Sequence, residues 1–199
     1  MGRPPRGSRP RREAILDAAL AAFVRRGVGG ATMGGVAAAA GASKTTLYRA
    51  FPDIDRLFAA VLAREVERRR GAIAAALDAA DLDGALRGAA DTMLDALDAD
   101  AVELFRLAIA EAGRRAQVSR GFHENLVASA AHPVAERLSR EWDMTATAAR
   151  LLALQFVGAI KEPLFYPRLL GVTPAHDRTT VVEQAMAMLH TARVAGPPV

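Results

Sequence analysis

The sequence of 199 residues predicts an all-α protein, with a three-helix helix-turn-helix head on a larger helical domain. Alanine is abundant, and it is the best helix former because fixing it in a helix costs no side-chain entropy. Apolar residues make up 51% of the chain, which is enough for a packed core. Valine and isoleucine never form the alternating runs that a half-buried strand requires.

The first helix is predicted from about Pro10, because apolar residues recur at helical spacing on one face from Ile15 to Phe23. Gly27 suits the position after a helix, so Val28–Ala31 is expected to be a loop. Thr32 is a plausible N-cap for a second, short helix that ends near Ala40.

A tight turn and a third short helix follow. Gly41 can take the left-handed conformation that such a turn demands. Ser43 can cap a helix from Lys44 to about Ala50, and Phe51-Pro52 closes it because the residue before a proline avoids helical angles. Helix, glycine-containing turn and helix together are the plan of a helix-turn-helix, whose second helix enters the major groove of DNA.

The third helix has the chemistry of a DNA-reading surface. Leu47 and Phe51 lie one turn apart and can face the supporting helices. Hydroxyl, ammonium, phenol and guanidinium groups are left to face outward and can donate to phosphates or base edges: Ser43, Lys44, Thr45, Thr46, Tyr48 and Arg49. Between Ala31 and Pro52 no carboxylate occurs that would repel phosphate. An αα-corner with an ordinary polar face is the alternative.

The rest of the chain predicts a long helix from Asp55 and five more helices beyond it. Thr145 or Thr147 is expected to open a strongly apolar helix whose end Pro163 and Pro167 disturb. The expected ranges after the long helix are Asp83–Leu97, Ala101–Glu111, a helix through Phe122 to Trp142 that bends at Pro133, Leu151–Phe165, and a last helix through Val181 and Ala192.

Several segments in fixed order resemble the N-terminal domain of TetR-type repressors over about residues 10–62. They are RREAILDAALAAFVRRG, Thr32, Val36-Ala37, Ala40-Gly41, Ser43-Lys44, Thr46-Leu47-Tyr48 and Phe51-Pro52. The resemblance implies a three-helix DNA-binding head on a helical body and a dimer formed through the last two long helices. It also implies phosphate contacts from Thr32 and Tyr48, with Ser43 to Thr46 at or near the groove floor.

Two positions depart from that family pattern. Ile54 stands where the family usually has a lysine near phosphate, so one contact per half-site is expected to be missing. Gly34 and Gly35 lie inside the second helix, where each glycine costs roughly 0.5–1 kcal/mol relative to alanine. The second half resembles the family less specifically, through Leu104 to Arg115.

The charge is divided unevenly along the chain. The net charge is +4, yet residues 1–50 alone carry +7, which leaves −3 for the rest. A basic front suggests a polyanion as partner, and the arginines of the N-terminal segment could follow the DNA backbone or its minor groove: Arg3, Arg6, Arg9, Arg11 and Arg12. The alternative function is a helical interaction protein whose basic arm binds an acidic partner or a membrane surface.

Other functional classes find little support in the sequence. No cysteine is present, which excludes disulfides and cysteine metal sites and fits a reducing cytoplasm. The four histidines show no metal-ligand spacing, and no GxSxG, HExxH or P-loop occurs, so neither an enzyme nor a cofactor is expected. The longest uncharged stretch, Val28 to Ser43, is too short for the roughly 20 residues of a membrane span.

The expected function is a ligand-responsive transcriptional regulator, most simply a repressor. Residues 1–54 would bind DNA and residues 55–199 would bind the effector and dimerise. A homodimer formed through the last two helices would match a palindromic operator with half-sites about 34–36 Å apart, or a multiple of that. An unknown small molecule would release it. The candidate pocket residues are Leu104, Phe105, Phe122, His123, Leu126, Trp142 and Phe156.

Overall fold

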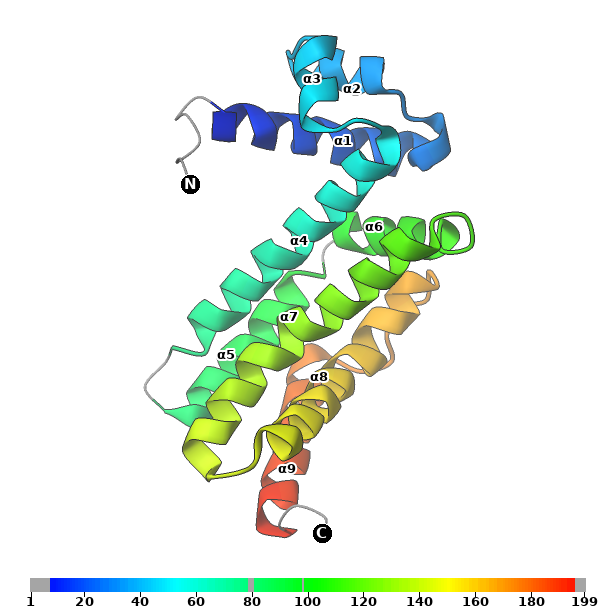
Figure 1. Ribbon diagram of the computed structural model, residues 1–199. Helices are drawn as coiled ribbons and strands as arrows, with labels where there is room; N and C mark the ends of the chain where they lie inside the picture. The colour runs from blue at the N-terminus through cyan, green and yellow to red at the C-terminus, as the bar shows by residue number, and fades with distance from the viewer. Residues whose placement is uncertain (1–7, 79–80, 98, 196–199) are drawn as a thin grey trace. The chain divides into compact units, whose positions relative to one another are not determined.

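The computed structural model describes residues 8–78, 81–97 and 99–195, and within these ranges the regular structure is entirely α-helical. The chain divides into two compact units, residues 1–65 with 103–122 and residues 66–102 with 123–199. Figure 1 labels the helices, which are α1 (Ser8–Gly30), α2 (Met33–Ala39), α3 (Lys44–Ala50), α4 (Ile54–Ala76), α5 (Leu82–Asp95), α6 (Ala99–Ala110), α7 (Ala116–Trp142), α8 (Ala146–Leu169) and α9 (Arg178–Ala195). The all-α prediction is therefore confirmed.

The first unit contains the helix-turn-helix formed by α2 and α3, which Figure 1 shows packed on α1. Helix α1 breaks at Gly27, whose backbone is left-handed with φ of 70° and ψ of 170°. Residues 28–30 then form one more helical turn, so the loop expected there is wrong. The apolar Val28 is 1% exposed, and burying this side chain holds the turn against the head.

Aromatic packing joins α1 to α4 in the core of the head. The rings of Phe23 and Phe58 meet edge to face with centroids 5.3 Å apart, and both residues are fully buried. Such pairs add about 0.5–1.5 kcal/mol beyond the area they bury. On the surface, the Arg64 guanidinium of α4 donates to Asp17 Oδ1 of α1 at 2.7 Å. The head is thus fixed to the first part of α4 by core packing and by an ion pair.

Helix α4 begins one residue earlier than expected. Asp53 provides the N-cap, since its Oδ1 accepts a hydrogen bond from the backbone N–H of Arg56 at 2.7 Å. A carboxylate at this position also interacts favourably with the positive end of the helix dipole. Asp55 therefore lies inside the first turn instead of starting the helix.

A segment from later in the chain completes the first unit. It comprises most of α6, the following turn and the start of α7, and Phe105 and Phe122 meet within it edge to face at 5.3 Å. The hydroxyl of Ser119 donates to the carbonyl of Ala108 at 3.2 Å. Arg115, between α6 and α7, pairs with Asp55 in the first turn of α4. This segment therefore packs as one body with the beginning of α4.

The second unit is a helical bundle in which α9 packs against α8 and α5. Its core consists of buried side chains such as Leu86, Leu138, Phe156 and Leu189. Arg178, at the start of α9, donates to the carboxylates of two α5 residues, Asp91 at 2.8 Å and Asp95 at 2.6 Å. The last helix is thereby fixed both through its apolar face and at its N-terminal end.

Thr145, one of the two residues expected to open α8, is its N-cap, because its Oγ1 accepts a hydrogen bond from the backbone N–H of Ala148 at 3.2 Å. Three other expected boundaries in the body need correction. Pro163 and Pro167 do not end this helix, which continues to Leu169. Each proline removes one backbone hydrogen bond, yet Leu164 and Phe165 are 3% exposed and their burial holds the last turns in place. Helices α5 and α6 begin at Leu82 and Ala99, slightly before the expected residues.

Candidate nucleic-acid interface

Serine and threonine side chains cap both helices of the helix-turn-helix, as the sequence predicts. Thr32 Oγ1 accepts from the backbone N–H of Gly35 at 3.1 Å, and Ser43 Oγ accepts from that of Thr46 at 3.1 Å. Between the helices Gly41 has a φ of 61°, a conformation that residues with a Cβ rarely adopt. Each cap contributes about 1 kcal/mol, so a seven-residue helix such as α3 depends on it.

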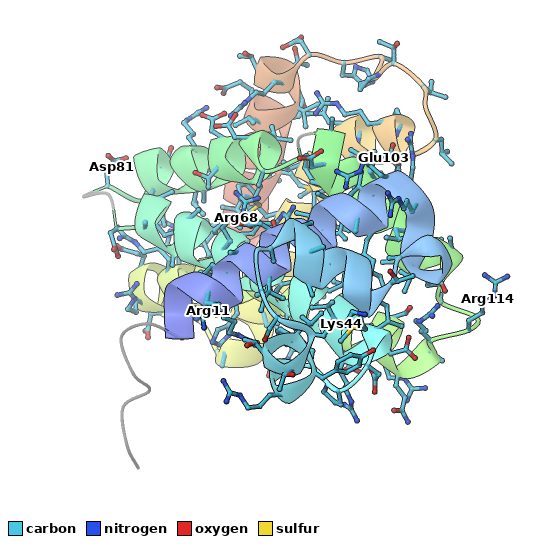
Figure 2. All side chains as sticks on the ribbon, turned by 90° about the horizontal axis from the view of Figure 1, so that it is seen from above. Arg11, Lys44, Arg68, Asp81, Glu103 and Arg114 are labelled. Carbon is cyan, nitrogen blue, oxygen red and sulfur yellow. The ribbon has the colours of Figure 1, made fainter. Side chains whose placement is uncertain are left out.

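The two faces of α3 differ as predicted. Leu47 is fully buried, and Phe51, which follows the helix, is 3% exposed. The exposed side carries Lys44, Thr45, Tyr48 and Arg49. Figure 2 looks onto the head from the side of α2 and α3, with Lys44 within this face and Arg11 of α1 toward one edge. This face has groups that can donate hydrogen bonds to the phosphate backbone and to base edges.

The outward-facing residues Ser43, Lys44, Thr45, Thr46, Tyr48 and Arg49 together form what is called the recognition face. Two of its hydroxyls form a hydrogen bond with each other. Ser43 Oγ and Thr46 Oγ1 lie 2.8 Å apart, a hydrogen bond in which either can be the donor. Together with the cap to Thr46 N, this bond fixes the orientation of both side chains. Thr45 takes part in no such contact and is exposed, so it is better placed than its neighbours to meet a base.

The side chain of Lys44 lies close to Gly34 of α2, a contact that the sequence does not reveal. A Cβ on Gly34 would lie 3.3 Å from Lys44 Cε and 3.8 Å from Nζ. The lysine side chain therefore passes back over α2 at the point where a glycine leaves room for it. Gly34, which the sequence indicated only as destabilising α2, thus leaves the room that the cationic end of Lys44 occupies on the recognition face.

The basic residues of α1 occupy different environments. Arg12 places its guanidinium 4.7 Å from the centre of the Phe51 ring, a cation–π contact that joins α1 to the C-terminal end of α3. Arg11 is exposed. Arg9 lies in α1, but its side chain falls outside the described part, and Arg3 and Arg6 fall outside the described residues altogether. Ile54 is half-buried, consistent with a position that carries no phosphate-binding cation.

An ion-pair bridge, missed in the sequence analysis, connects the start of α4 to the turn after α6. Arg115 Nε donates to Asp55 Oδ1 at 2.6 Å, and a second guanidinium nitrogen pairs with the buried carboxylate of Glu111. The bond to Asp55, with smaller contributions from both acidic charges, raises the pKa of Arg115 above its ordinary value. In the sequence, only the four-residue spacing of Glu111 and Arg115 indicates part of this bridge. The pairing with Asp55 has no local signal, since Asp55 lies 60 residues away.

The candidate pocket residues are distributed over both units. Leu104, Phe105 and Phe122 are buried in the first. In the second, Phe156 is fully buried and Leu126 is half-buried, whereas His123 is exposed. Trp142 is half-buried at the end of α7, where its ring lies 6.3 Å from that of His190.

The described part of the chain contains no group of three or more histidine, aspartate or glutamate side chains that could hold a metal ion. None of its helices is long and apolar enough to cross a bilayer.

Models of known protein families match both the N-terminal and the C-terminal part of the chain. The model of the N-terminal domain of bacterial TetR-family regulatory proteins matches residues 15–61. The model of the C-terminal domain of AefR-like transcriptional repressors matches residues 89–192, more than half of the chain. No functionally curated protein sequence matches the chain at a significant level.

Solved structures resemble nearly the whole chain. One is a protein of Mesorhizobium loti described as a TetR-family transcriptional regulator, 25% identical with a TM-score of 0.75, covering 96% of this chain and 98% of its own. Another is the flavonoid-responsive regulator FrrA, 24% identical with a TM-score of 0.71, covering 92% and 96%. The transcriptional regulator FadR of Bacillus subtilis, solved with stearoyl-CoA, is 14% identical with a TM-score of 0.65, covering 89% and 96%.

The capped helix-turn-helix, the exposed donors of α3 and the two matching family models agree with one another. The chain belongs to the TetR family of bacterial transcriptional regulators, with a C-terminal domain of the AefR-like kind.

Proposed function

We propose that this regulator is a repressor that binds a palindromic operator as a homodimer and leaves it when a small molecule binds. Residues 1–54 bind DNA, and residues 55–199 bind the effector and form the dimer. The observation that carries the proposal is the exposed face of α3, where Lys44, Thr45, Tyr48 and Arg49 project from a helix that is capped and packed on its opposite side. Repression needs no catalysis, because occupying the operator blocks polymerase.

The DNA contacts divide into two kinds. Thr32 and Tyr48 hold phosphates, together with the arginines of α1 and the N-terminal arm, including Arg9, Arg11 and Arg12. Ser43, Lys44, Thr45, Thr46 and Arg49 lie at or near the groove floor. Phosphate contacts set the register and carry the salt dependence, whereas contacts to base edges carry sequence preference.

The dimer forms through α8 and α9. Large apolar side chains are exposed on these helices, with exposed fractions of 51% for Leu151, 49% for Tyr166 and 40% for Met188. Gln155 and Gly158 lie one and two turns after Leu151 on the same face of α8, and both are exposed and uncharged. Apolar and uncharged side chains of this kind are typical of the core of a protein–protein interface. A twofold axis through this face presents two recognition helices to a symmetric duplex.

Release requires an effector that binds the form unable to hold DNA better than the form that holds it. In the first unit, Arg115 joins the turn after α6 to the first turn of α4, and α4 follows the recognition helix directly. A shift of that turn therefore reaches α3 through an ion pair and a continuous backbone. Solved relatives include a flavonoid-responsive regulator and one bound to stearoyl-CoA, which supports a small organic effector.

Selection of bound duplexes from a random pool tests the proposed function. The expected result is an inverted repeat, bound by two copies of the chain, with affinity that falls as salt rises but remains specific. The competing function, an arm that binds any acidic surface, predicts equal retention of all sequences. Enrichment of no sequence, or binding by a monomer, would overturn the proposal. A bacterial regulator that binds DNA acts where the DNA is, so the protein is proposed to act in the cytoplasm.

A further inference from the structure

Small side chains leave a hollow of about 710 Å³ between α7 and α8 in the second unit. An alanine side chain ends at Cβ, so a seam lined by alanines is not filled by the helices that form it. On its core side α7 is packed, because Val134 and Leu138 are fully buried. The apolar lining consists of Ala128, Ala131, Ala135, Ala146 and Leu154.

Two arginines lie at one end of this hollow, one on each helix. Arg140 is in the last turn of α7 and Arg150 is near the start of α8, so they flank the connection between the helices. Both residues are exposed, and neither pairs with a carboxylate within the described part of the chain. Arg140 reaches only the backbone carbonyl of Glu136 in its own helix, at 3.4 Å. The two charges are therefore available to a ligand.

The other polar groups of the hollow are already engaged. Glu136, a carboxylate in the lining, has its Oε1 3.3 Å from Nε2 of His132, one turn earlier on α7. His132 precedes Arg140 by eight residues, which is about 12 Å along a helix. The hydroxyl of Ser139 donates to the carbonyl of Met144 at 3.0 Å. The hollow thus combines an apolar floor with two cations at one end.

We propose that this hollow binds the effector, which is accordingly a mainly apolar molecule with one anionic end. Ligand pockets are typically apolar, with a few polar groups that fix the orientation of the ligand. Two guanidiniums on opposite sides of one end match a carboxylate, which accepts hydrogen bonds from both. This inference rests on the proposed effector-dependent function and adds the place and the chemical class of the ligand. The lining residues differ from the pocket residues that the sequence suggested.

A ligand in this hollow contacts two helices that the proposed function uses. Leu154 lies one turn after Leu151, which belongs to the exposed face proposed for the dimer. Helix α7 begins at Ala116, directly after Arg115, which pairs with Asp55. A ligand that moves α7 against α8 can therefore act on the dimer face and, through a continuous helix, on that ion pair.

Three probes test the charge and the apolar requirement, with binding measured by calorimetry on the full-length protein at pH 7.5. Decanoate and 1-decanol share an alkyl chain and differ in charge, whereas butyrate keeps the carboxylate and lacks most of the chain. Decanoate should bind at least about 10-fold more tightly than 1-decanol, because charge-assisted hydrogen bonds add to the same apolar contact. Butyrate should bind at least about 10-fold more weakly than decanoate, since each buried methylene contributes.

Substitutions assign this preference to the hollow. Arg140→Met and Arg150→Met should each weaken decanoate about threefold or more and leave 1-decanol within about twofold, and the double variant should abolish the difference. Arg150→Lys retains the charge and should retain most of the preference. Ala128→Phe adds a ring at an exposed lining position and should weaken both probes about 10-fold or more. Arg120→Met is the matched control, because Arg120 is exposed on the same helix but lies in the first unit, and it should change neither probe.

The inference is overturned if decanoate does not bind, if 1-decanol binds as tightly, or if the preference survives the double variant. It is likewise overturned if Ala128→Phe leaves both affinities unchanged, or if Arg120→Met lowers them as much as the other variants, because the probes then bind elsewhere. Thermal unfolding identifies a misfolded variant, and in that case Arg140→Gln and Arg150→Gln provide the same comparison. DNA selection without any probe tests the repressor proposal separately, so either result can fail while the other holds.

Discussion

Removing the guanidinium of Arg115 should destabilise the first unit, because this group neutralises a buried carboxylate. This side chain is 17% exposed and contacts two carboxylates. The Asp55 side chain is 54% exposed, so its pair with Arg115 contributes about 0–1 kcal/mol. Glu111 is 6% exposed, and removing its partner leaves a buried charge, which costs about 3–5 kcal/mol.

The two contributions together set the expected loss for Arg115→Met at about 3–5 kcal/mol. Adding Glu111→Gln should recover most of it, because a neutral amide no longer needs a cation.

Urea unfolding followed by circular dichroism measures these free energies for the single and double variants. Arg114→Met is the matched control, since it removes an exposed arginine from the adjacent position. It should change the free energy of unfolding by less than about 0.5 kcal/mol. A loss below about 1 kcal/mol for Arg115→Met, or no recovery in the double variant, would refute the view that this arginine neutralises a buried charge.

The remaining predictions concern the recognition face and the dimer. Thr45→Ala should reduce the discrimination between bases at one position per half-site by about 1–3 kcal/mol, whereas Tyr48→Phe should weaken the binding of all duplexes alike. Competition titrations with single-base operator variants measure both effects, and the reverse pattern would contradict the assignment. Gly34→Ala should stabilise α2 by about 0.5–1 kcal/mol while displacing Lys44 and weakening operator binding, so equal affinity in gel-shift titrations would contradict the proposed positioning. Leu151→Glu should give a monomer in light scattering with weaker operator binding, and a persistent dimer would exclude α8 from the interface.

Local signals made the head predictable. Thr32 and Ser43 each cap a helix through a backbone N–H three residues later, so cap and helix start are encoded within four consecutive residues. Gly41 adopts the positive φ that the turn needs. The buried positions Leu47 and Phe51 followed from their spacing. Predictions failed where the local structure depends on packing. The loop predicted after Gly27 is a helical turn, because the burial of Val28 holds it in that form.

The relations between distant residues were not predictable. Lys44 and Gly34 lie ten residues apart, and their contact depends on the angle between α2 and α3. Asp55 and Arg115 meet only because the segment after α6 packs against the start of α4. Pro163 and Pro167 suggested the end of α8, yet packing of Leu164 and Phe165 outweighs two lost hydrogen bonds. A periodic pattern shows which face is buried but not what is packed against it.

The local origin of the recognition helix restricts how an effector can act. Helix α3 has its N-cap from Ser43 and its buried anchors in Leu47 and Phe51, all within nine residues, so nothing outside the head is needed to form it. The bridge from Arg115 ends on Asp55, after the recognition helix and inside the first turn of α4. A signal that arrives there should displace α3 as a folded element and not melt it. Amide exchange in residues 44–50 should accordingly stay unchanged when an effector releases the operator, and accelerated exchange confined to α3 would show that release proceeds by local unfolding instead.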